Sequence, residues 1–187
     1  MSETSIYLIR HGETQYAWDQ DNDSPLSSDG CLQSEELIEK LNNDDLTSFD
    51  LISSPKKRAR QSAAPLSKFL DKAVVINDVY VEIPFSGIKQ EQKNEWLNNI
   101  MHMNIAKLPK EIKAWRNNIL NEIKDSKQNK IIFTHFMVIN VIAGDYYKNK
   151  SLLYFYPDYL SITKITLSNN TIIDLKLGYR KKTQINT

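Results

Sequence analysis

The sequence has little cysteine, no excess of one charge and no long apolar run, and each shortage excludes a class of protein. Its single cysteine, Cys31, cannot form an internal disulfide, which fits a reducing compartment. Lys and Arg number 24 against 23 Asp and Glu, so the overall charge does not favour nucleic acid or an anionic membrane as a partner. No apolar run approaches the roughly 18 residues of a membrane span, and the polar residues 1–5 do not begin a signal peptide. We therefore expect a cytoplasmic protein.

Histidine is also scarce, which bears on cofactors. The three histidines have no paired carboxylates at ligand spacing near them, so we expect neither a metal centre nor another cofactor. The length of 187 residues with 41% hydrophobic content suits one full core. Since no internal repeat or low-complexity linker interrupts the chain, we expect a single domain over residues 1–187.

Three short apolar runs, each followed by a helical pattern, organise the chain. They cover residues 6–9, 49–52 and 131–133, and such runs are typical of strands buried on both faces of a parallel sheet. Residues 74–76 suit a fourth strand, and Asn169-Asn170 between two alternating segments predicts a C-terminal hairpin. Apolar residues recur at helical spacing in three segments: Cys31 to Leu41, Ala59 to Leu70 and Ile112 to Ile123.

This alternation predicts a three-layer α/β/α sandwich around a mostly parallel central sheet. Ser54-Pro55 is a good N-cap and first-turn pair for the helix that contains Ala59. Residues 84–129 separate two predicted strands by more than one ordinary connection needs. We interpret this segment as a helical excursion, which either crosses over as a plain helix pair or covers the substrate as a lid. Lys93 within it is expected on a solvated face.

A polar pair follows each of the three apolar runs. Arg10-His11 follows the first run, Ser53-Ser54 the second with Arg58 one turn into the next helix, and Thr134-His135 the third. Because the carboxyl ends of parallel strands meet at one edge of the sheet, two histidines and two arginines should converge there. Arginines and helix N-termini at that edge favour a phosphate group as the ligand.

These residues carry a family resemblance. The sequence resembles the histidine phosphatase superfamily, which includes the phosphoglycerate mutase-like enzymes, over most of its length and in the same order. The matching motifs are Arg10-His11-Gly12-Glu13-Thr14, Pro25-Leu26-Ser27 with Gly30 and Gln33, Ser53-Ser54-Pro55 with Arg58-Ala59 and Gln61-Ser62-Ala63, and Thr134-His135.

The resemblance implies a phosphoglycerate mutase-like fold and a phosphohistidine intermediate. It makes His11 the nucleophile, with Arg10, Arg58 and His135 as donors to the phosphoryl oxygens. It also places Thr14 and Gln15 at the phosphate. Family members often carry an asparagine a few residues after the Arg10-His11-Gly12-Glu13 motif, but this chain reads Gln15-Tyr16-Ala17-Trp18, so that amide is either missing or supplied by Gln15. Phe136 stands where the family usually has glycine, and Ile88-Lys89 where a tryptophan is common.

A departing alkoxide needs a proton from a general acid. The resemblance assigns this role to Glu82, in a Glu-x-x-x-x-Gly setting that ends at Gly87. Glu13 is the alternative, but its place directly after the nucleophile suits the orientation of an arginine better.

Three functions remain open at this point. The first is a metal-independent phosphatase that acts on a small phosphomonoester. The second is a phosphomutase, which returns the phosphoryl group to another hydroxyl. The third is a non-catalytic sensor that binds a phosphorylated ligand. The complete set of nucleophile, acid and cationic donors favours the phosphatase over the sensor. The excursion over residues 84–129 is shorter than the corresponding region of the sugar-acid mutases that the chain resembles, which favours the phosphatase over the mutase.

Overall fold

The structure is a computed structural model that describes residues 3–42 and 44–180. The described part contains six strands and five α-helices. In chain order these are β1 (Thr4–Arg10), α1 (Ser28–Leu41), β2 (Asp50–Ser53), α2 (Lys57–Leu70), β3 (Val74–Ile76), α3 (Lys93–His102), α4 (Lys110–Lys124), β4 (Lys130–Thr134), α5 (Phe136–Tyr146), β5 (Ile162–Ser168) and β6 (Thr171–Lys176). No helix within these residues is both long enough and apolar enough to cross a membrane.

The strands form one sheet in the order β3-β2-β4-β1-β5-β6. The first four run parallel, while β5 pairs antiparallel with β1 and β6 pairs antiparallel with β5. The predicted mostly parallel sheet with an antiparallel edge is confirmed. The turn of the β5–β6 hairpin has positive φ angles at Asn169 and Asn170 (50° and 62°), which asparagine tolerates better than most residues.

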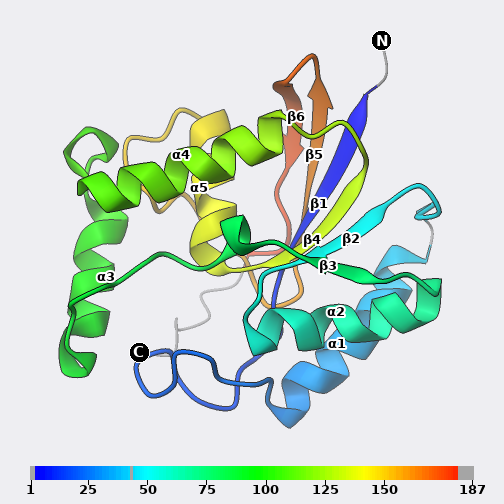
Figure 1. Cartoon of the computed structure of the whole chain (residues 1–187), viewed down its shortest axis with the longest axis horizontal. Helices are drawn as coiled ribbons and strands as arrows, with labels where there is room; N and C mark the ends of the chain where they lie inside the picture. Colours follow the sequence, from blue (N-terminus) through cyan, green and yellow to red (C-terminus); the bar gives the residue numbers. More distant parts are fainter. Residues whose placement is uncertain (1–2, 43, 181–187) are drawn as a thin grey trace.

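Helices cover both faces of this sheet, which gives the predicted three layers (Figure 1). Side chains alternate along β1, so that Ile6 and Leu8 enter one core while Ile9 enters the other. The first core contains buried residues of α4 and α5, and the second contains buried residues of α1 and α2. Residues 84–129 contain both α3 and α4, of which α4 packs against α5.

The prediction that Ser54 caps the N-terminus of α2 is wrong. The helix begins at Lys57 with Lys56 at the N-cap position, so Ser54 lies two residues before the cap. The Ser54 hydroxyl lies 2.7 Å from Nε2 of His135 and accepts a long hydrogen bond, 3.4 Å, from the Lys56 N–H. A carboxylate from elsewhere in the chain takes over this role. The backbone N–H of Lys57 donates to Oδ1 of Asp23 at 2.8 Å, and an acidic group at a helix N-terminus is electrostatically favourable.

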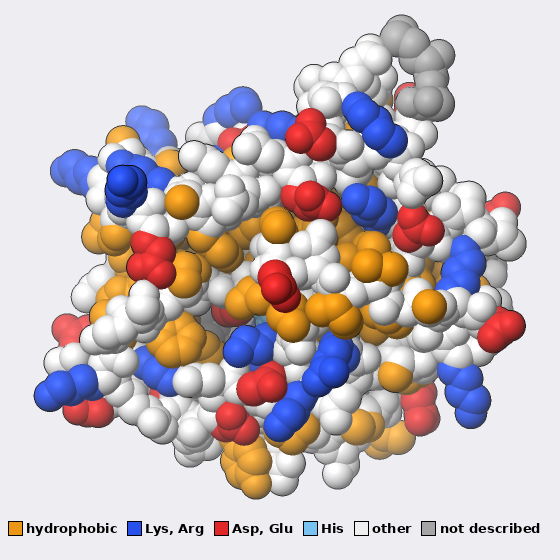
Figure 2. Space-filling model, viewed as in Figure 1, with side chains coloured by type: hydrophobic (Ala, Val, Ile, Leu, Met, Phe, Trp, Pro, Cys, Tyr) orange, Lys and Arg blue, Asp and Glu red, His pale blue; other side chains and the backbone are white. Residues whose placement is uncertain are grey.

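The molecular surface carries charges of both signs. On the face shown in Figure 2, Lys and Arg side chains are interspersed with Asp and Glu around a central area of apolar side chains. This mixture agrees with the near-zero net charge of the sequence and gives this face no field of a single sign.

Candidate active site

The carboxyl ends of β1, β2 and β4 bring the predicted polar pairs together. Arg10 pairs with Thr134 in the sheet, and Ser53 pairs with Phe133 on the other side of β4. The backbone N–H of His11 continues the ladder with a 2.9 Å hydrogen bond to the Thr134 carbonyl. As a result, the rings of His11 and His135 lie 5.3 Å apart, although 124 positions separate them in the chain.

The contacts of His11 define its protonation state. Nδ1 lies 2.8 Å from the Gly12 carbonyl, which can only accept, so Nδ1 carries the proton. Nε2 accepts a hydrogen bond from Nε of Arg58 at 3.2 Å and therefore carries a lone pair. Burial, with Arg58 and Arg10 nearby, holds the pKa of His11 well below its ordinary value of 6.5. The ring is thus a neutral imidazole with its lone pair directed at a guanidinium.

Two buried arginines flank this histidine. Arg10 donates from a terminal nitrogen to the Pro157 carbonyl at 2.8 Å, and its guanidinium lies 4.1 Å from the centre of the Tyr159 ring. Arg58 donates from a terminal nitrogen to the Asn22 carbonyl at 3.3 Å. Burial lowers the pKa of both arginines, while the nearby charge of Glu82 acts in the opposite direction. Their planar forks are preorganised for a phosphoryl group.

Glu82 lies in the same pocket, on the chain that leads from β3 towards α3. Its carboxyl oxygens accept hydrogen bonds from the backbone N–H groups of Ile83 (2.8 Å) and Met137 (3.3 Å). Burial raises the pKa of Glu82, and these two amides and both arginines oppose the rise. A carboxyl group with a raised pKa stays protonated over a wider pH range, which a general acid needs.

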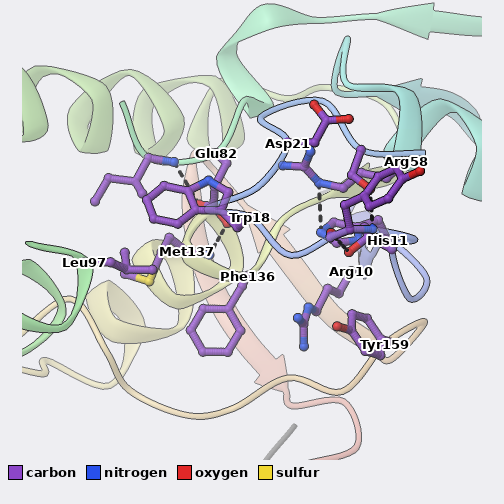
Figure 3. A pocket seen from close by; sticks show the side chains of 14 residues that line it. Arg10, His11, Trp18, Asp21, Arg58, Glu82, Leu97, Phe136, Met137 and Tyr159 are labelled. Carbon is purple, nitrogen blue, oxygen red and sulfur yellow. Dashed lines mark hydrogen bonds between the residues drawn. The ribbon is translucent and has the colours of Figure 1, made fainter. Parts of the chain in front are cut away.

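The described residues that line the pocket fall into two groups (Figure 3). The arginine side consists of Arg10, His11, Arg58 and Tyr159. The apolar side consists of Trp18, Ile83, Leu97, Phe136 and Met137, and Glu82 lies among them. Thr14, Tyr16, Asp21 and Ser24 complete the lining. Among the described residues, no three His, Cys, Asp or Glu side chains are grouped so that they could hold a metal ion.

Comparison with known proteins decides the family. A family model, histidine phosphatase superfamily (branch 1), matches residues 6–176. The chain belongs to this superfamily. No curated protein matches the sequence significantly.

Several solved structures share the fold of this histidine phosphatase superfamily protein. They include an α-ribazole phosphatase from Shigella flexneri (21% identity, 94% of this chain and 96% of that chain covered, TM-score 0.72). A phosphoserine phosphatase from Entamoeba histolytica covers 98% of this chain and 100% of its own at 21% identity and TM-score 0.68. A phosphoglycerate mutase from Bacillus anthracis covers 94% and 92% at 17% identity and TM-score 0.69.

The other predicted phosphate ligands of this superfamily member lie at different depths. Thr14 lines the pocket and donates its hydroxyl to the Tyr16 carbonyl at 3.0 Å. Gln15 is exposed, lies outside the lining and donates to the Tyr16 hydroxyl at 3.2 Å. His135 is fully buried behind the lining against Ser54, and burial lowers its pKa well below the ordinary value. Its imidazole is therefore neutral in this structure.

Glu13 and Lys93 have contacts that the sequence did not suggest. Glu13 accepts a hydrogen bond from the Ser27 hydroxyl at 3.2 Å, so its observed contact is to the loop before α1 and not to an arginine. The expectation of a solvated Lys93 is wrong, because this side chain is 5% exposed. Its ammonium donates to the Asn22 side chain and lies 4.6 Å from the centre of the Phe85 ring and 5.6 Å from that of Trp18.

Sequence reasoning missed several lining residues, above all Trp18, Asp21, Leu97 and Tyr159. Tyr159 lies 149 positions after Arg10, and Leu97 comes from α3, so neither belongs to a local motif around the strand ends. The one available signal was the pair of aromatic residues Tyr16 and Trp18, five and seven positions after His11.

Proposed function

We propose that this protein is a metal-independent phosphatase that hydrolyses a small phosphomonoester through a phosphohistidine intermediate on His11. The observation that carries the proposal is the state of His11: a buried neutral imidazole whose Nε2 lone pair faces the guanidinium of Arg58. Such a nitrogen is a competent nucleophile for phosphorus. Two arginines supply the positive charge that phosphoryl transfer needs, and Glu82 supplies an acid in the same pocket.

In the first step, Nε2 of His11 attacks phosphorus, so that an N–P bond forms and the ester P–O bond breaks. The incoming phosphoryl group has to replace the hydrogen bond from Arg58 to Nε2, and Arg58 then donates to the phosphoryl oxygens. The proton of Glu82 goes to the departing alkoxide. The ring becomes positively charged, and the hydrogen bond from Nδ1 to the Gly12 carbonyl stabilises this charge.

In the second step, water attacks the phosphohistidine and the N–P bond breaks. Glu82, now a carboxylate, accepts the proton that the water loses. Inorganic phosphate leaves, and His11 and Glu82 return to their starting forms. A mutase would share the first step but would use a second hydroxyl of the substrate in place of this water.

The first experiment is a rapid quench with phosphorus-labelled p-nitrophenyl phosphate in excess chelator. It compares the wild type with His11→Ala and, as a matched control, with His102→Ala, because His102 is exposed on α3. We expect an acid-labile, alkali-stable phosphoenzyme and release of inorganic phosphate in the wild type and the control, and neither in His11→Ala.

Other outcomes separate the alternatives. Label retained in His11→Ala would move the nucleophile to another residue. Loss of turnover in chelator would contradict metal independence. If the wild type bound vanadate but formed no phosphoenzyme, the non-catalytic sensor would replace the phosphatase. Transfer of label to an added alcohol in preference to water would favour the mutase.

A further inference from the structure

We propose that the alcohol part of the substrate is apolar or aromatic and carries no anionic group close to the phosphate. This inference rests on the proposed function, because it assigns the leaving group of the same reaction. It starts from the division of the pocket. In Figure 3, His11, Arg10, Arg58 and Tyr159 lie on one side, while Trp18, Leu97, Phe136 and Met137 lie with Glu82 on the other.

The position of Glu82 links this division to the chemistry. A general acid has to lie next to the leaving oxygen, so the alcohol part must extend from phosphorus towards Glu82. The groups around Glu82 are therefore the groups that meet the alcohol. Ile83 and Met137 are joined to its carboxyl through their backbone amides, and their side chains line the pocket.

The apolar side is held in place by its neighbours. Trp18 packs edge-to-face on Phe85 with ring centres 5.0 Å apart, and the Lys93 ammonium lies near both rings. Phe136 packs edge-to-face on Tyr156 at 5.7 Å. Leu97 is 6% exposed and belongs to the core that contains α4 and α5. A surface fixed in this way can bury an apolar or aromatic group without having to order itself first.

The charges of the lining oppose a second anion. Among its described residues, the cations are Arg10 and Arg58, which flank His11 where the phosphoryl group is received, and the Arg10 guanidinium also lies 5.2 Å from the centre of the Phe136 ring. The remaining ionised residue in the lining is acidic, Asp21, because Glu82 carries a proton when the substrate binds. A carboxylate on the alcohol would lose its hydration against apolar side chains, and the cation within its reach, Arg10 beside Phe136, would have to be shared with the phosphoryl group.

Lys93 is a buried cation next to Trp18 but is not part of the lining. Its ammonium is occupied by the Asn22 side chain and by the rings of Phe85 and Trp18, and it lies behind the lining. The structure thus favours a neutral aromatic or aliphatic alcohol over a phosphorylated hydroxy acid or amino acid.

Binding of phosphonates tests the proposal without turnover, because their P–C bond is not hydrolysed. Calorimetry on the full chain compares benzylphosphonate, 3-phosphonopropionate and methylphosphonate. Burial of one ring should make benzylphosphonate bind about tenfold more tightly than methylphosphonate, or better. We expect 3-phosphonopropionate to bind no more tightly than methylphosphonate. Equal or tighter binding of the carboxylate ligand would overturn the proposal, as would failure of all three to bind.

Variants assign the preference to the pocket. Trp18→Ala should lose most of the benzyl preference, while Trp96→Ala, on α3 but outside the lining, should keep it. Asp21→Asn removes a negative charge of the lining and should raise the affinity for 3-phosphonopropionate relative to benzylphosphonate. A benzyl preference that survives Trp18→Ala and is unaffected by Asp21→Asn would overturn the assignment. Since no step of this test needs a phosphoenzyme, its result is independent of whether His11 is phosphorylated.

Discussion

The three histidines show how the surroundings of a single residue decide its chemistry. His11 is buried with a carbonyl on Nδ1 and a guanidinium on Nε2, so it is neutral and carries a lone pair on Nε2. His135 contacts the Ser54 hydroxyl, and its burial together with the nearby charge of Arg58 lowers its pKa, so it is neutral as well. His102 is exposed and its Nδ1 contacts the Asn98 carbonyl one turn earlier in α3. Burial and the atoms in contact with each ring therefore distinguish the three histidines.

The role of Glu82 is tested at this same scale. Glu82→Gln keeps the shape of the side chain but removes the transferable proton. We expect phosphoenzyme formation from an alkyl phosphate to slow by about 10²- to 10⁴-fold, because an alkoxide is a poor leaving group without a proton. Formation from p-nitrophenyl phosphate should slow much less, since nitrophenolate leaves unprotonated. Rapid-quench measurements with both substrates give the comparison.

Glu13→Gln is the matched control for this prediction. Its carboxylate contacts Ser27, so we expect no dependence of its effect on the leaving group. Equal slowing of both substrates by Glu82→Gln, or a leaving-group effect in Glu13→Gln, would remove Glu82 from the role of acid.

At the scale of elements, α5 positions a loop that supports the site. Asn140 on α5 is fully buried, and its side-chain oxygen accepts hydrogen bonds from the backbone N–H groups of Tyr154 (2.8 Å) and Phe155 (2.9 Å). The same loop continues to Pro157 and Tyr159, which contact the guanidinium of Arg10. The helix that begins after β4 therefore helps to hold the arginine side of the pocket through a connection about twenty residues later.

Asn140→Leu tests this connection. The substitution leaves two buried N–H groups without their acceptor, and we expect the free energy of unfolding to fall by about 2–4 kcal/mol. Urea denaturation measures the change. Asn117→Leu, at an exposed position of α4, is the control and should change stability by less than about 0.5 kcal/mol. A loss below about 1 kcal/mol in Asn140→Leu would show that the loop is held by other contacts.

The two buried neutral histidines make the stability of the whole molecule depend on pH. In the unfolded chain each would titrate near 6.5, whereas folding lowers both pKa values. The unfolded state therefore binds more protons as the pH falls below about 6.5, and stability falls with it. Glu82, with its raised pKa, acts in the opposite direction, because its protonated form is favoured by folding.

His11→Gln isolates one of these contributions. As the pH falls from 6.5 to the lowered pKa, each buried histidine reduces the free energy of unfolding by up to about 1.4 kcal/mol per pH unit. We expect the slope of unfolding free energy against pH, from pH 7 to 5, to be shallower by up to that amount in His11→Gln. His102→Gln is the control, since its ring stays in water. An unchanged slope in His11→Gln would mean that this imidazole is not neutral in the folded protein.

Local patterns in the sequence determined most of the architecture. Continuous apolar runs followed by helical spacing define β1, β2 and β4 and the helices after them, because both signals arise from residues close together in the chain. The convergence of Arg10, His11, Arg58 and His135 also followed from the sequence, since parallel strands always bring their carboxyl ends to one edge. The location of the site was therefore predictable before the structure.

Tertiary structure alone decided which side chains complete the pocket and what each polar group contacts. Trp18, Leu97 and Tyr159 reach it from three separate segments, Asp23 takes the capping role expected of Ser54, and Lys93 is buried against aromatic rings. Each of these contacts joins residues far apart in the chain, so no periodicity or short motif records it. Partners for buried polar groups are chosen by the packing of whole elements, which one sequence does not specify locally.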